Sequence, residues 1–207
     1  MTSQSDWNRA SAILIGSLLA GCSGLTSSGV APVALDPAAA TASAMKEFDS
    51  NSDQKLSQDE LKACRGLLSA MGQFDQDADG SISADELSSA LIGFQKQDAS
   101  LVAINCVVNH NNKPLEGAKI EFVPEAFLGG AISPASGITG TDGTASPSIP
   151  DAEIPEQYRG RVKGVYCGIY RIVVTHPTVQ IPAKFNAQSE LGRVVTRRDH
   201  EPLVVNF

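Results

Sequence analysis

The sequence predicts an α+β fold in which a small all-α part is followed by an all-β part. Between residues 36 and 97, apolar residues recur at helical spacing around two short acidic segments. From about residue 100 onward, short runs rich in β-branched residues alternate with turn-forming Gly, Pro, Asn and Asp, which is typical of strands. The chain has 207 residues, which is enough for two domains. We therefore expect a helical domain over residues 36–97 and a β domain over residues 100–207.

The strongest motif is the acidic segment of residues 75–86, which reads DQDADGSISADE. Side-chain oxygens fall at positions 1, 3, 5, 9 and 12, a main-chain carbonyl is available at position 7, and Gly80 occupies position 6, where the chain must bend. Calcium takes six to eight oxygen ligands, and a short segment supplies them only by curling around the ion. The segment resembles an EF-hand loop. The resemblance implies a Ca²⁺ site with the ligands Asp75, Asp77, Asp79, Ser81 (carbonyl), Ser83 and Glu86.

A second copy of the pattern lies upstream at residues 49–60, which read DSNSDQKLSQDE. Gln54 occupies the glycine position there, and a positive φ at this residue would cost roughly 1 kcal/mol. With three carboxylates against four, this loop is expected to bind calcium more weakly than the second loop. Leu56 and Ile82, both at position 8, are expected to pair their backbones. The implied ligands are Asp49, Asn51, Asp53, Lys55 (carbonyl), Ser57 and Glu60.

Helices are expected on both sides of this loop pair. Asp36 and Pro37 provide a helix N-cap and a first-turn proline, so a helix is predicted to begin there and to lead into the first loop. Residues 61–74 carry apolar side chains at helical spacing between the loops, and residues 87–94 provide the exit helix. These features complete an EF-hand pair over residues 36–97.

The first residues look like a targeting signal. Residues 12–20 form an apolar run that is too short to span a bilayer, which needs about 20 apolar residues. The run ends in Leu-Ala-Gly-Cys22, which resembles the lipobox of bacterial lipoproteins. The resemblance implies a signal peptide at residues 1–21, an acylated Cys22, and a chain held outside the cytoplasmic membrane in the cell envelope. An ordinary secretory signal and a buried helix are the alternatives. Residues 22–35 are rich in Ser, Gly and Ala and are expected to form a flexible tether.

The β part carries four phrases in a recognisable order: KPLEGAKIEFVP (residues 113–124), TGTDG (139–143), GIYRIVV (168–174) and IPAKFN (181–186). Together they resemble carboxypeptidase-regulatory-like, transthyretin-like domains. The resemblance implies a transthyretin-like (prealbumin-like) β-sandwich that serves as an accessory or binding module rather than as a catalyst. Cys106 and Cys167 stand where such domains more often carry Gly or Pro. In an oxidising compartment they are a possible disulfide pair, and two unpaired small apolar residues are the alternative.

The net charge and the absence of known catalytic motifs reduce the number of function classes that fit the sequence. The net charge is −7, and residues 45–97 carry ten Asp or Glu against five Lys or Arg, so no basic face is available for nucleic acid. No G-x-S-x-G, H-E-x-x-H or P-loop motif occurs, and we expect no enzymatic activity. The sequence thus predicts a non-catalytic, calcium-binding lipoprotein that contacts the membrane through its acyl chains and a protein or glycan through its β part. The alternatives are an accessory subunit or enzyme with a site in loops 124–136 or 150–167, and a calcium sensor.

Overall fold

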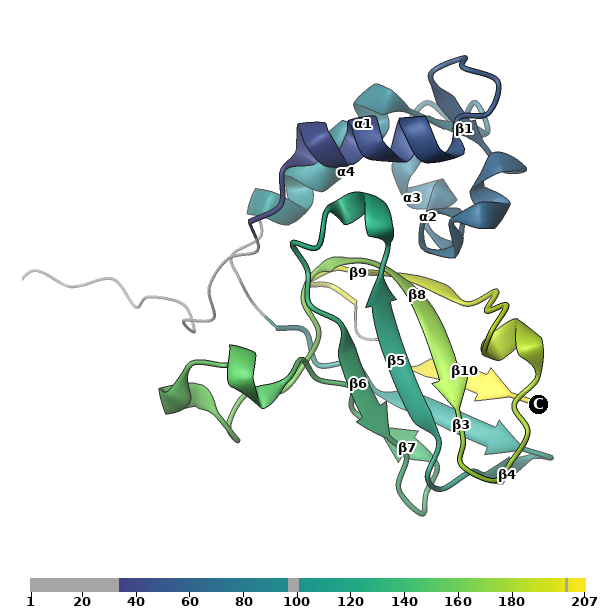
Figure 1. The fold of residues 1–207 in the computed structure, drawn as a ribbon, viewed down its shortest axis with the longest axis vertical. Helices are drawn as coiled ribbons and strands as arrows, with labels where there is room; N and C mark the ends of the chain where they lie inside the picture. The colour runs from purple at the N-terminus through teal and green to yellow at the C-terminus, as the bar shows by residue number, and fades with distance from the viewer. Residues whose placement is uncertain (1–33, 97–100, 200) are drawn as a thin grey trace, which may run out of the picture.

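A computed structural model describes residues 34–96, 101–199 and 201–207 of the chain. The α-helices gather at one end of the molecule, and two four-stranded sheets form most of the rest (Figure 1). The fold is therefore α+β, with the helical part first in the chain. None of the described helices is long and apolar enough to cross a membrane. The predicted signal peptide, Cys22 and all but the last two residues of the predicted tether lie outside the described residues.

The helical part is framed by two helices that pack against each other, α1 (Pro37–Phe48) and α4 (Ala84–Lys96) (Figure 1). Helix α1 begins as predicted, because the Asp36 carboxylate accepts hydrogen bonds from two main-chain N–H groups of the first turn at 3.1 and 3.0 Å. The interval between the loops folds into three short pieces, η1 (Glu60–Ala63), α2 (Arg65–Ser69) and α3 (Met71–Phe74). The apolar side of this part is buried, including Ala44, Leu61, Leu67, Phe74, Leu87 and Leu91.

The two acidic loops are joined by a short antiparallel ribbon of β1 (Lys55–Ser57) and β2 (Ser81–Ser83). Leu56 lies opposite Ile82 in this ribbon, and both side chains are fully buried. The predicted pairing of the two position-8 residues is therefore confirmed.

The first sheet has the order β6-β5-β8-β9, and every neighbouring pair is antiparallel. Alternate residues of β5 are buried, which follows from the period of two in its sequence, whereas β8 begins with three consecutive buried residues. Strand β8 contains the whole of the GIYRIVV phrase at residues 168–174. The strands of this sheet are β5 (Lys119–Pro124), β6 (Ala135–Ile138), β8 (Gly168–Thr175) and β9 (Gly192–Val195).

The second sheet is built around β3 (Cys106–His110), which pairs in parallel with β10 (Leu203–Asn206) and antiparallel with β4 (Lys113–Pro114) and β7 (Thr144–Ala145). The sequence predicts a strand from residue 101, but the ladder begins only at Cys106, and Val102 forms an isolated bridge with Val165 instead. The connections include four 3-10 turns: η2 (Ala126–Leu128), η3 (Asp151–Glu153), η4 (Glu156–Tyr158) and η5 (Ala183–Phe185).

The helical part packs directly on the first sheet. Helix α2 contacts β9 and β8, and α1 contacts η2, which projects from the end of β5 towards the helices (Figure 1). The rings of Phe48 and Phe127 meet edge to face with centroids 6.2 Å apart. The main-chain N–H of Gly66 donates to Glu125 Oε1 at 2.9 Å. Buried residues of the helical part and of both sheets form one hydrophobic cluster, so the two parts share a core.

Candidate metal centre

The second loop holds its own carboxylates in place through its backbone. Asp75 caps the end of α3, and its two carboxylate oxygens accept hydrogen bonds from the N–H groups of Asp79 at 3.1 Å and Gly80 at 2.9 Å. Asp77 Oδ1 accepts from the same Asp79 N–H at 3.1 Å. Gly80 has a φ of 87° and Ala78 a φ of 60°, so the chain turns through two left-handed residues. This bend points the carboxylates inward.

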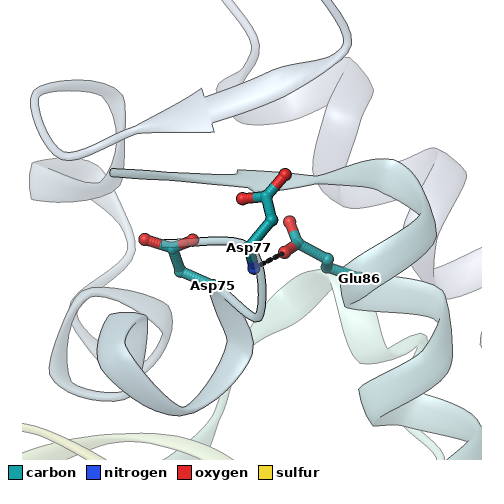
Figure 2. Close-up of side chains that lie close together, drawn as sticks. All are labelled: Asp75, Asp77 and Glu86. Carbon is teal, nitrogen blue, oxygen red and sulfur yellow. Dashed lines mark hydrogen bonds between the residues drawn. The ribbon is translucent and has the colours of Figure 1, made fainter. Parts of the chain in front are cut away.

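Three of the predicted ligands meet at this bend. One carboxylate oxygen each from Asp75, Asp77 and Glu86 lies within 4.8 Å of the others, as Figure 2 shows for the three side chains. Calcium binds oxygens at about 2.3–2.6 Å, so ligands on opposite sides of one ion are about 5 Å apart. The spacing of these oxygens therefore fits one calcium coordination shell. Ser81 and Ser83 lie in β2, beside this cluster in the chain.

Glu86 is held at the start of α4 by reciprocal hydrogen bonds with Ser83. The N–H and hydroxyl of Ser83 donate to Glu86 Oε2 at 2.8 and 2.7 Å, and the N–H of Glu86 donates to the Ser83 hydroxyl at 3.3 Å. This is a capping box, which satisfies two N–H groups at the helix start. Glu86 Oε1 accepts the N–H groups of Gln76 at 2.7 Å and Asp77 at 3.4 Å. These bonds, that from the Ser83 N–H foremost, lower the pKa of Glu86 to about 2, so the carboxylate is ionised at neutral pH.

The first loop repeats this architecture. Asp49 Oδ2 accepts the N–H of Gln54 at 2.9 Å, and Asn51 Oδ1 accepts the N–H of Asp53 at 2.9 Å. Gln54 has the predicted positive φ, 64°. Ser57 donates to Glu60 through its N–H at 2.9 Å and its hydroxyl at 2.7 Å.

Hydrogen bonds also keep the first loop's closing carboxylate ionised. Donation from the N–H and hydroxyl of Ser57 and from Ser50 lowers the pKa of Glu60 to about 2. The three carboxylates of this loop, however, do not form a close group like that of the second loop among the residues that the structure describes. Asn51 takes the place of one carboxylate. The weaker calcium binding expected of the first loop stays a prediction.

One contact between the loops was not foreseen from the sequence. The ammonium group of Lys55 forms an ion pair with Asp79 Oδ2, which joins position 7 of the first loop to position 5 of the second. From the sequence, only the backbone carbonyl of Lys55 was expected to take part in the site. The expected antiparallel pairing of Leu56 with Ile82 could have indicated this contact. That pairing places the residues next to Leu56, including Lys55, beside the second loop.

Comparison with known proteins supports the second loop. Residues 69–92 match the family model described as EF hand, and this stretch contains α3, the second loop and most of α4. The match does not extend to the first loop. No curated protein and no solved structure matches the chain. The family match and the acidic cluster together support calcium binding at residues 75–86.

The β part holds a separate cavity of about 740 Å³ beside β6. Glu121, Asp151 and Lys163 line it together with several serine hydroxyls, among them Ser136 and Ser148. Glu121 already pairs with Lys119, whose ammonium lies 2.7 Å from it. The lining therefore offers mixed hydrogen-bond donors and acceptors.

The two cysteines predicted as a disulfide are thiols in the structure. Cys106 is buried in β3, where burial raises the pKa of its thiol to about 12, and Cys167 is partly buried immediately before β8. A raised pKa makes a thiol slow to react, because the thiolate is the nucleophile. The bridge between them stays a prediction for secreted material.

Proposed function

We propose that the protein is a non-catalytic, calcium-binding lipoprotein of the cell envelope, in which an EF-hand pair stabilises a β module with a structural or binding role. The observation that carries the proposal is the second loop, where three carboxylates converge at calcium spacing within a stretch that matches the EF-hand family. Bound there, calcium would be held by Asp75, Asp77, Asp79, Ser83 and Glu86 together with the carbonyl of Ser81, and it would neutralise their mutual repulsion.

The packing of the helices favours a structural role for the ion over that of a sensor. Calcium sensors expose an apolar groove between their helices when the ion binds. In this chain Phe127 and Leu128 of the β part are buried, and Phe127 packs against Phe48 of α1. Helix α2 is also covered, by β9. Because the β part already covers these helical faces, calcium is expected to strengthen the docking of the two parts.

For the β part, we infer a transthyretin-like sandwich. Two observations support this inference: two separate sheets are present, and buried residues from both, including Val108 and Phe122, belong to one cluster. The cavity beside β6 is the place we assign to a partner. Its hydroxyl, carboxylate and ammonium groups are suited to a polar ligand such as a glycan.

The proposed membrane anchor is supported by the lipobox-like sequence that ends at Cys22. Diacylglyceryl modification supplies two acyl chains, and two chains give stable membrane attachment where a single chain gives only marginal binding. The test is labelled palmitate uptake and cell fractionation in a bacterial host. Wild type is expected in the membrane with label, and Cys22→Ala in the soluble fraction without it. Cys64→Ala is the matched control and should stay in the membrane. Retention of Cys22→Ala in the membrane would contradict the anchor.

The calcium assignment is tested by thermal unfolding of the chain from residue 22 with and without calcium. An ion that binds the native state stabilises it by RT ln(1 + [L]/Kd), which is about 2.7 kcal/mol at one hundred times Kd. For a chain of this size that corresponds to a rise in Tm of about 5–11 °C. Magnesium at equal concentration is the control, because a loop built for calcium discriminates against the smaller ion. An unchanged Tm at millimolar calcium would refute the assignment.

A further inference from the structure

Asp79 stands apart from the other carboxylates of the second loop. Asp75, Asp77 and Glu86 point oxygens towards a common centre, and Asp79 does not belong to that group. Both of its oxygens are engaged elsewhere. Oδ1 accepts the N–H of Ser81 at 2.9 Å, and Oδ2 is paired with the ammonium of Lys55. The position-5 ligand is therefore held by a cation that belongs to the first loop.

Lys55 is placed for this contact by the ribbon between the loops. It lies opposite Ser83 in the β1–β2 pairing, which sets its side chain beside the second loop. Its contact with Asp79 raises the pKa of Lys55 and lowers the pKa of Asp79, so both groups are charged at neutral pH. The residue at the equivalent position of the second loop is Ser81, which has no charge to offer in return. Position 7 therefore supplies a cation from the first loop to the second loop, and none from the second loop to the first.

We propose that Lys55 is a tethered competitor for calcium at the second loop, and that it sets how much calcium this loop requires. The inference rests on the proposed calcium function. For the ion to gain Asp79 as a ligand, the ammonium must leave Oδ2 and return to solvent. Calcium entry thus exchanges an internal cation for an external one, and the free energy of the broken ion pair is subtracted from that of binding.

The expected effect follows from the exposure of the pair. The two side chains are 46% and 32% exposed, so water screens their attraction. Pairs of this kind contribute modestly, and removing this one is expected to tighten calcium binding at the second loop by about twofold to fivefold. The first loop should be little affected, because its ligand from Lys55 is the backbone carbonyl.

The test is a calcium titration of the ¹⁵N-labelled chain from residue 22, read at the assigned amide of Gly80. This amide donates to Asp75 Oδ2 at 2.9 Å, so its chemical shift reports the second loop. The first loop has Gln54 at the same position and contributes no such glycine signal. The variant is Lys55→Met. The matched control is Lys62→Met, which removes the same charge from an exposed pair with Asp59, a residue outside the ligand set.

Support for the proposal is a Kd at Gly80 that falls about twofold to fivefold in Lys55→Met and by about 1.5-fold or less in Lys62→Met. Lys55→Arg, which keeps the cation, should bind calcium within about 1.5-fold of wild type. Equal changes in the two methionine variants would overturn the role of Lys55 and leave calcium binding intact. Absence of any calcium-dependent shift at Gly80 in wild type would remove the proposed function itself, and this inference with it.

Discussion

Gly192 is a residue at which strand β9 lies directly against the backbone of helix α2. A Cβ atom added there would lie 1.8 Å from the carbonyl oxygen of Arg65 and 2.2 Å from its carbonyl carbon. Ordinary contacts between such atoms are about 3.5 Å or longer. Both obstructing atoms are backbone, so no side chain can turn aside. In Gly192→Ala, helix α2 and strand β9 must therefore separate by more than an ångström.

The cost of this separation is that of overpacking, about 1–3 kcal/mol. For a chain of this length, such a loss lowers Tm by about 2–12 °C. Because α2 lies between the two loops, calcium affinity should fall together with stability. Gly93→Ala is the matched control. It lies inside α4 with nothing within 4 Å of the added methyl, and alanine is favoured over glycine in a helix by about 1 kcal/mol.

Urea unfolding followed by far-ultraviolet circular dichroism, in saturating calcium, measures both variants. The midpoint is expected to fall for Gly192→Ala and to rise slightly for Gly93→Ala. An unchanged midpoint for Gly192→Ala would refute the close approach of β9 and α2, and with it the docking that the proposed structural role of calcium requires.

Three further predictions concern the loops and the thiols. Glu86→Gln should remove most of the calorimetric heat of calcium binding, and Glu60→Gln should remove the smaller share. Glutamine keeps the capping box in both loops and loses only the charge. An equal loss of heat in the two variants would contradict the expectation that the second loop binds calcium more strongly. Gln54→Gly should raise unfolding stability by about 1 kcal/mol, since Gln54 has a φ of 64°, and an unchanged urea midpoint would argue against strain there. Mass spectrometry of a non-reduced digest of secreted protein should find Cys106 joined to Cys167, and thiols at both would rule the bridge out.

Acid sensitivity gives a fifth prediction. The pKa values of Glu60 and Glu86 in the folded chain are about 2, below their usual value of 4.5. A lowered carboxyl pKa means that the ionised form stabilises the fold, so this contribution is complete above about pH 4.5 and is lost as the pH falls towards 2. Without calcium, unfolding free energy should therefore decline across this window, and the double variant Glu60→Gln, Glu86→Gln should flatten the decline. An equally steep decline in that variant would contradict the assignment.

The features that could be predicted from the sequence are those that a few neighbouring residues decide. The ligand spacing of residues 75–86 sets the bend at Gly80, and the same spacing at residues 49–60 forces Gln54 to a positive φ. Asp36 and Pro37 begin α1 because a helix start needs acceptors for its free N–H groups. The period of two over residues 117–123 specifies β5, because a strand with one buried face alternates.

Apart from the pairing of Leu56 with Ile82, the tertiary structure alone decided which of these elements meet. The pairing of Lys55 with Asp79 joins residues 24 positions apart, and a lysine on an acidic loop has several carboxylates within reach until the ribbon selects one. The sequence likewise predicted helices at residues 61–74 without indicating that α2 would lie on β9. The apolar residues of a helix show that one face is buried, but they do not show which other element covers that face. The physical reason is range: helix caps and loop turns are settled within a dozen residues, whereas burial is settled by whichever apolar surfaces fit together in the whole chain.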